Sequence, residues 1–189
     1  MGEEGYLGAN QPVEYGGAGG DFLFDAIVME ELAYARCHAL QASLHTDICL
    51  PYLTSFGTEA QKQKYLRPGI AGECLVAIAM TEPGVGSDLA GVQTRAIRDG
   101  DHYVLSGSKT FISNGQNCDL VIVVAKTDPA KRHDGISLIL VERARPASGA
   151  AATSTRSASR ARTRASCSSR TAACRSRTCW GTRAADSRC

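Results

Sequence analysis

Two loop-like segments hold the residues whose types and spacing suit ligand binding. The first, residues 81–88 (TEPGVGSD), follows an apolar run, and its small residues let a ligand approach the backbone. Backbone N–H groups around Gly86 and Ser87 suit a planar heterocycle or a phosphate. The segment lacks the third glycine and the following helix of a dinucleotide fingerprint, so a plain Gly-rich turn is the alternative.

The second segment ends at Ser113-Asn114-Gly115. Asn-Gly is a common turn, and a turn without a ligand is again the alternative. The functional interpretation gives Phe111 an aromatic face and Ser113 a hydroxyl, both offered to a ligand that the first segment also touches.

Helical periodicity comes first along the chain, and strand-like runs follow it. We predict helices over residues 22–42, 44–55 and 58–68, with Asp21 and Thr58 as caps and a break near Pro51. The expected buried stripe of the first helix is Phe22, Ala26, Met29, Ala33 and Cys37. Strands are predicted over residues 74–80, 92–98, 102–111, 120–126 and 136–141, with a hairpin turn at Asp99-Gly100.

This order favours an α+β fold rather than an alternating parallel sheet. We expect a partial helical domain over residues 1–73 and a partial antiparallel β domain, barrel or sandwich, over residues 74–143. Residues 144–189 hold ten arginines and one acid, and Trp180 is their only large apolar side chain. Such a stretch cannot bury enough surface to offset the entropy of ordering, so we predict a disordered tail.

The cysteines and the apolar runs argue against a metal site, a membrane span and a secretory signal. No C-x-x-C pair occurs and the histidines are scattered, so no metal site is predicted. No apolar run approaches the roughly 20 residues of a membrane span, and no secretory signal precedes the first helix. We therefore expect a soluble, cytoplasmic protein with reduced thiols.

Four blocks, in order along the chain, resemble the acyl-CoA dehydrogenase family. They are residues 14–20 (EYGGAGG), 77–88 (AIAMTEPGVGSD), 105–115 (LSGSKTFISNG) and 136–142 (ISLILVE). The blocks extend across most of residues 1–143, and together they outweigh the plain-turn interpretations. The similarity is greatest to the long-chain branch, and short-chain or branched-chain members are the alternative.

The resemblance implies a helical domain, a middle β domain and a C-terminal four-helix domain, with FAD between the last two. It implies that Ser87 also reaches the acyl-CoA. The family often has Trp and Thr where this sequence has Phe111 and Ser113, so the aromatic face and the hydroxyl are kept but one N–H is lost. The implied FAD-binding residues are Ile78, Met80, Thr81, Gly86, Ser87, Phe111 and Ser113.

The family oxidises acyl-CoA thioesters to trans-2-enoyl-CoA in fatty-acid β-oxidation. A glutamate removes the α-proton while a hydride passes to FAD. That glutamate belongs to the C-terminal domain, for which the sequence has no counterpart, so no catalytic residue is predicted and Glu82 is expected to be structural. An electron-transfer flavoprotein is the partner implied for an intact member, and the family's tetramer is not expected of this fragment. We expect no turnover and weak or no FAD binding.

Residues 147–188 resemble nothing in the family. Re-read in a shifted frame from the codon of Pro146, they give a string that resembles the family's continuation. A deleted base is therefore our hypothesis, which sequencing of the locus would test. The alternative is a basic nucleic-acid-binding arm, which the absence of lysine from the tail disfavours.

Overall fold

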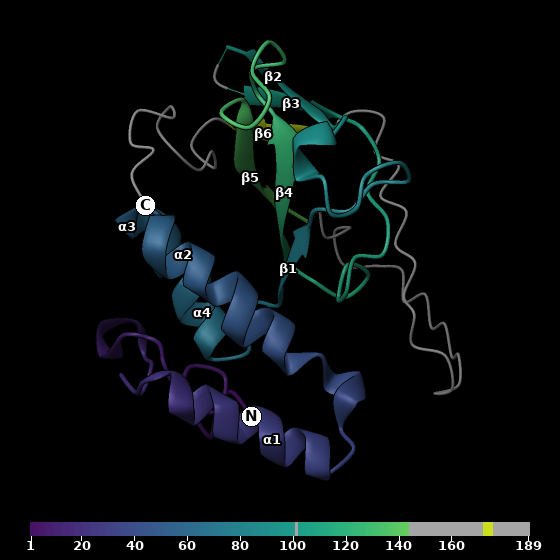
Figure 1. Cartoon of the computed structure of the whole chain (residues 1–189). Coiled ribbons are helices and arrows are strands. Elements are labelled where there is room, and N and C mark those ends of the chain that lie inside the picture. The colour runs from purple at the N-terminus through teal and green to yellow at the C-terminus, as the bar shows by residue number, and fades with distance from the viewer. Residues whose placement is uncertain (101, 144–171, 176–189) are drawn as a thin grey trace, which may run out of the picture.

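The structure, a computed structural model, describes residues 1–100, 102–143 and 172–175. Figure 1 shows the helices in the lower half of the molecule and the strands in the upper half, which confirms the predicted α+β class. The α-helices are α1 (Phe22–Tyr34), α2 (Leu50–Phe56), α3 (Glu59–Gln61) and α4 (Arg67–Ile70). The strands are β1 (Val76–Ala79), β2 (Arg95–Asp99), β3 (His102–Ser106), β4 (Leu120–Lys126), β5 (Ile136–Glu142) and β6 (Ala172–Arg175).

Tighter and wider helical turns join these elements. The 3-10 helices are η1 (Val13–Tyr15), η2 (His38–Leu40) and η5 (Leu89–Gly91), and the π-helices are η3 (Leu44–Cys49) and η4 (Lys62–Leu66). The predicted break near Pro51 is the change from η3 to α2, in whose first turn a proline needs no N–H partner.

Both predicted helix caps are confirmed. The Asp21 carboxylate accepts the N–H of Leu23 at 2.9 Å, and Thr58 forms a capping box with Gln61. The first helix is shorter than predicted, because Arg36 takes a left-handed φ of 56° just after α1.

Two other expectations about the helices are wrong. Pro68-Gly69 lies inside α4 rather than ending the preceding helix, since proline is tolerated in a first helical turn. The predicted apolar stripe of α1 is not its buried face: Phe22 and Met29 are exposed, and Asp25 is the buried residue of α1. Apolar residues occur around the whole of α1, so periodicity could not select a face.

The sheet is mixed, and the predicted antiparallel arrangement is therefore wrong in part. Its strand order is β1-β4-β2-β3-β6, with β5 on β4. β1 runs parallel to β4, with Val76 opposite Leu120, whereas β2–β3 and β4–β5 are antiparallel. Forty residues separate β1 from β4, and a connection of that length permits a parallel crossover.

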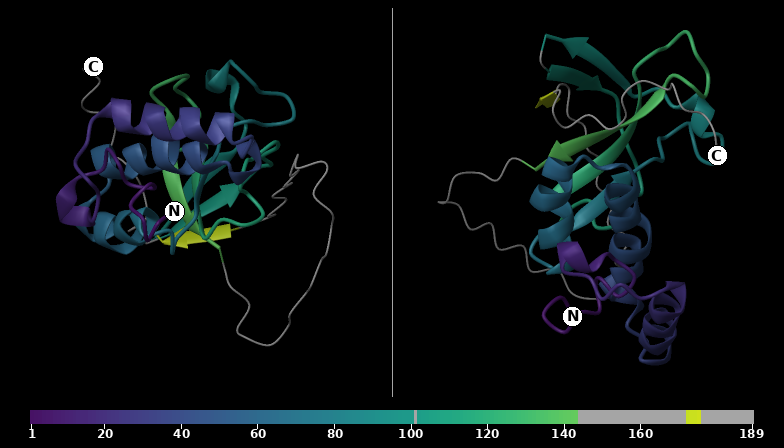
Figure 2. Two further views of the ribbon diagram at one scale, coloured as in Figure 1. Left: turned by 90° about the horizontal axis from the view of Figure 1, so that it is seen from below. Right: turned by 90° about the vertical axis from the view of Figure 1, so that its left-hand side faces the viewer.

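The main core lies where the helices meet the sheet. Leu50, Leu53 and Leu66 pack from the helices against Ile122 and Leu140 of β4 and β5. In Figure 2 (right) the helices lie below the strands, which agrees with this packing. A second cluster, with Ala77, Ala79, Ile112 and Cys118, anchors the segment between β3 and β4 on β1.

Only residues 172–175 of the tail are among the described residues. They form β6, which pairs antiparallel with β3, and the disorder expected of residues 144–189 stays a prediction. The pairing is made by backbone groups, which need no apolar side chains. The other residues of 144–189 lie outside the described residues. The frameshift hypothesis concerns that part of the chain. Within the described ranges, no helix is long and apolar enough to cross a membrane.

Candidate functional site

The structure brings the two segments predicted to bind a ligand together. The N–H of Thr110 donates to the carbonyl oxygen of Thr81 at 2.9 Å, which joins the chain after β3 to the chain after β1. Phe111 directly follows this contact and is 65% exposed, with a left-handed φ of 57°. The next residue, Ile112, is buried in the second cluster, where it packs the segment against β1.

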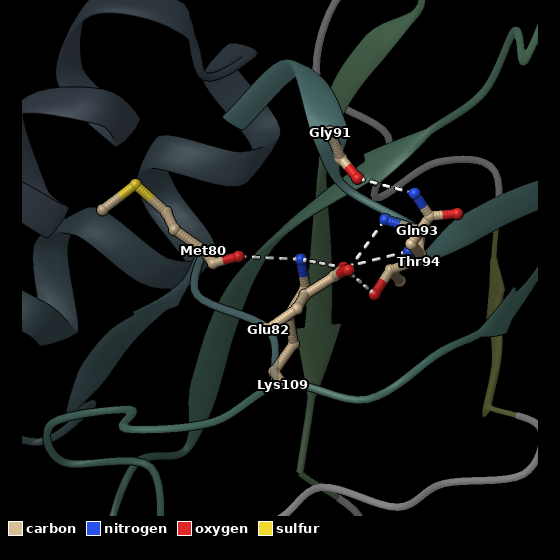
Figure 3. Close-up of polar contacts among 6 residues, drawn as sticks. All are labelled: Met80, Glu82, Gly91, Gln93, Thr94 and Lys109. Carbon is tan, nitrogen blue, oxygen red and sulfur yellow. Dashed lines mark hydrogen bonds and ion pairs between the residues drawn. The ribbon is translucent and has the colours of Figure 1, made fainter. Parts of the chain in front are cut away.

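Glu82 of the first segment forms a buried ion pair with Lys109, the residue before Thr110 (Figure 3). Lys109 Nζ lies 2.9 Å from Glu82 Oε1 and donates to the Met80 carbonyl oxygen at 3.0 Å. The carboxylate of Glu82 also accepts the N–H groups of Gln93, at 2.7 Å, and Thr94, at 2.9 Å. The Thr94 hydroxyl donates to Glu82 Oε1 at 2.5 Å, so this carboxylate is fully occupied.

These contacts decide the charge states. Burial by itself would raise the pKa of Glu82, but the hydrogen bonds from Thr94, Lys109 and the Gln93 N–H hold it below the usual range. Burial lowers the pKa of Lys109, and the Glu82 carboxylate opposes that change. A carboxylate held in this way is a poor proton acceptor, which supports the structural role expected of Glu82.

The segment after Glu82 folds as a tight turn beside an open cleft. Glu82 and Val85 exchange backbone hydrogen bonds of 3.0 and 3.1 Å, and a Cβ at Gly84 or Gly86 would meet nothing within 4 Å. The cleft has a volume of about 660 Å³. It is lined by Glu82, Pro83, Gly84, Val85, Gly86, Asp88, Gly91, Gln93, Gly107 and Ser108.

The predicted FAD-binding residues lie around this region but do not all share the cleft. Gly86 lines it, and Ser87 is exposed on the same turn. Met80 and Ser113 are half-buried. The Ile78 side chain belongs to the main core, so only its backbone can meet a ligand.

Thr81 is half-buried, and its carbonyl oxygen accepts the hydrogen bond from Thr110. Neither Thr81 nor Phe111 lines the cleft. The sequence interpretation assigned no role to Lys109, Gln93 or Thr94. A lysine between small and apolar residues, 27 positions after Glu82, was the signal that could have indicated a buried pair.

Sequence profiles of two acyl-CoA dehydrogenase domains match the chain. The N-terminal domain matches residues 1–73, and the middle domain matches residues 77–169. The second match reaches into the arginine-rich tail, so the expectation that residues 147–188 match nothing in the family is wrong for residues 147–169. The mouse mitochondrial long-chain specific acyl-CoA dehydrogenase is 51% identical over 143 residues, or 75% of this chain and 33% of that protein. An isovaleryl-CoA dehydrogenase of Pongo abelii is 42% identical over 151 residues, or 77% of this chain and 35% of that protein.

Solved structures show the same fold. An acyl-CoA dehydrogenase from Geobacillus kaustophilus superposes with a TM-score of 0.81 at 40% identity, over 97% of this chain and 49% of that one. A structure described as the FAD complex of PigA has a TM-score of 0.71 at 32% identity, over 75% of this chain and 38% of that one. The chain spans about a third of the length of its curated relatives. With both domain profiles and the fold in agreement, the chain belongs to the acyl-CoA dehydrogenase family, FAD-dependent oxidoreductases of fatty-acid oxidation.

Proposed function

We propose that this chain supplies the flavin-binding part of an acyl-CoA dehydrogenase of long-chain type. The observation that carries the proposal is the Thr81–Thr110 hydrogen bond, because it unites the two segments to which the family resemblance assigns FAD. FAD would be held by the backbone of Ile78 to Thr81, by Gly86 and Ser87, and by Phe111 and Ser113.

The residues present fit a flat, partly polar group. Phe111 offers an exposed aromatic face, which suits stacking on a ring system. Ser113 offers a hydroxyl for a ring nitrogen, and the open space at Gly86 allows a close approach to the backbone. When bound, FAD supplies hydride acceptance, and this chain's residues supply orientation and hydrogen bonds.

The substrate and partner are part of the same proposal. Ser87 lies exposed on the turn beside the cleft, where it can contact an acyl-CoA thioester. An electron-transfer flavoprotein is the proposed electron acceptor, and one similar structure is titled an electron transferring flavoprotein of Acidaminococcus fermentans. A cytoplasmic location stays a prediction from the sequence.

The test is an FAD titration of the 189-residue chain, followed by flavin fluorescence and visible circular dichroism. We expect weak binding that the Phe111→Ala and Ser113→Ala substitutions weaken at least tenfold. Phe56→Ala is the matched control, because Phe56 is equally exposed but lies at the end of α2. Acyl-CoA should give no dye reduction with this chain.

Two results would contradict the proposal. One is the absence of any FAD signal with the folded wild-type chain. The other is equal affinity for FAD in the wild type, the Phe111→Ala variant and the Phe56→Ala control.

A further inference from the structure

The Glu82–Lys109 pair connects three stretches of chain that meet at the candidate site. Figure 3 shows Lys109 between the Met80 carbonyl and the Glu82 carboxylate, with Thr94 on the far side of Glu82. The side chains of Lys109 and Glu82 are only 5% and 4% exposed. The pair therefore couples the end of β1, the entry to β2 and the chain that follows β3.

Folding stability alone does not explain such a pair. Removing two charges from water costs several kcal/mol per ion, and an apolar pair of similar size is often as stable. The charged pair instead fixes the geometry, because the Lys109 ammonium group donates hydrogen bonds to both the Met80 carbonyl oxygen and the Glu82 carboxylate.

The backbone next to Lys109 is held in an uncommon conformation. Phe111 and Asn114 both have left-handed φ angles, of 57° and 61°. Left-handed backbone at a bulky residue such as Phe111 is unfavourable and persists only when the surroundings enforce it. The Thr110–Thr81 hydrogen bond and the Lys109 contacts enforce it here.

We propose that Glu82 and Lys109 are a positioning pair, which sets the Met80–Thr81 backbone and the Phe111 ring at the separation that a bound flavin requires. This inference rests on the proposed function. Neither side chain needs to touch the flavin, since both act through the backbone of Met80 and of residues 110 and 111.

The experiment uses Lys109→Met, Glu82→Gln and the double variant in the full chain. Each single variant leaves a buried polar partner unsatisfied and should be destabilised. The double variant removes both charges and should recover most of that stability. We expect FAD binding by the double variant to stay at least tenfold weaker than wild type, with altered visible circular dichroism.

The exposed pair Lys64–Glu142, at 2.7 Å and with side chains 57% and 51% exposed, provides the matched control. Lys64→Met with Glu142→Gln makes the same chemical change and should leave FAD binding unchanged. A folded Glu82→Gln/Lys109→Met variant with wild-type FAD affinity would overturn the inference.

Hydrogen exchange separates this inference from the proposed function. If the wild type binds no FAD, the proposed function fails, but the Thr110 N–H still reports on positioning. The inference expects faster exchange at Thr110 in the double variant, with β4 and β5 still protected. Unchanged protection at Thr110 would refute it whether or not FAD binds.

Discussion

His45 should make the folding stability of this protein fall steeply below neutral pH. Its ring is 2% exposed and joins η3 to two other elements. The Val76 N–H donates to Nδ1 at 3.1 Å, so Nδ1 is unprotonated, and Nε2–H donates to the Gly69 carbonyl oxygen at 2.9 Å. A second proton would put an N–H of His45 against the N–H of Val76.

The magnitude follows from proton linkage. Burial lowers the pKa of His45, and the Gly69 carbonyl acts in the opposite direction. The unfolded chain takes up a proton at a pKa of about 6.5, and the folded ring takes one up only at a lower pH. The unfolded state then binds more protons, so the contribution of His45 to stability rises with pH. From pH 7.5 to pH 5.5 that contribution should fall by at most about 1.4 kcal/mol, the limit in which the folded ring takes up no proton.

Urea unfolding at pH 5.5, 6.5 and 7.5, followed by circular dichroism, measures this loss. In His45→Gln the neutral amide offers a donor and an acceptor but does not titrate. The difference in unfolding free energy between wild type and His45→Gln should therefore be smaller at pH 5.5 than at pH 7.5, by at most about 1.4 kcal/mol. Carboxyl groups titrate in both proteins and cancel in the difference. His133→Gln, at an exposed position, is the control and should keep the wild-type slope.

The reasoning is refuted if His45→Gln and wild type lose stability in parallel between pH 7.5 and 5.5. That result would mean that the folded protein accepts the second proton on the buried ring.

Two further predictions concern the helical part and the turn beside the cleft. Burial, and then the charge of Asp47, raise the pKa of Asp25, and burial also raises that of Asp47. The charges of Asp25 and Asp47 therefore destabilise the fold increasingly as pH rises above about 4, so Asp47→Asn should raise the melting temperature at pH 7.5 but hardly at pH 4. Gly107→Ala should destabilise by about 1–3 kcal/mol in urea unfolding, because its Cβ would lie 2.7 Å from Thr94 Cα at a φ of 157°. Gly84→Ala, with open space around it, should cost far less, and equal losses would disprove the steric argument.

Local signals in the sequence were sufficient for several elements. Asp21 and Thr58 cap their helices, and Asp99-Gly100 turns the hairpin between β2 and β3, because side-chain caps and turn residues act over a few positions. Residues 120–126 form β4 with the predicted bounds. The four blocks, residues 14–20, 77–88, 105–115 and 136–142, together predicted the family, which the domain profiles confirm.

The sequence by itself therefore determined the order of helices and strands, the turns, the family and the two segments of the candidate site. The tertiary structure decided the parallel pairing of β1 with β4, which face of α1 is covered, and the contact of Glu82 with Lys109. The reason is physical: caps, turns and periodicity depend on neighbouring residues, whereas these contacts depend on the path of the chain between distant residues.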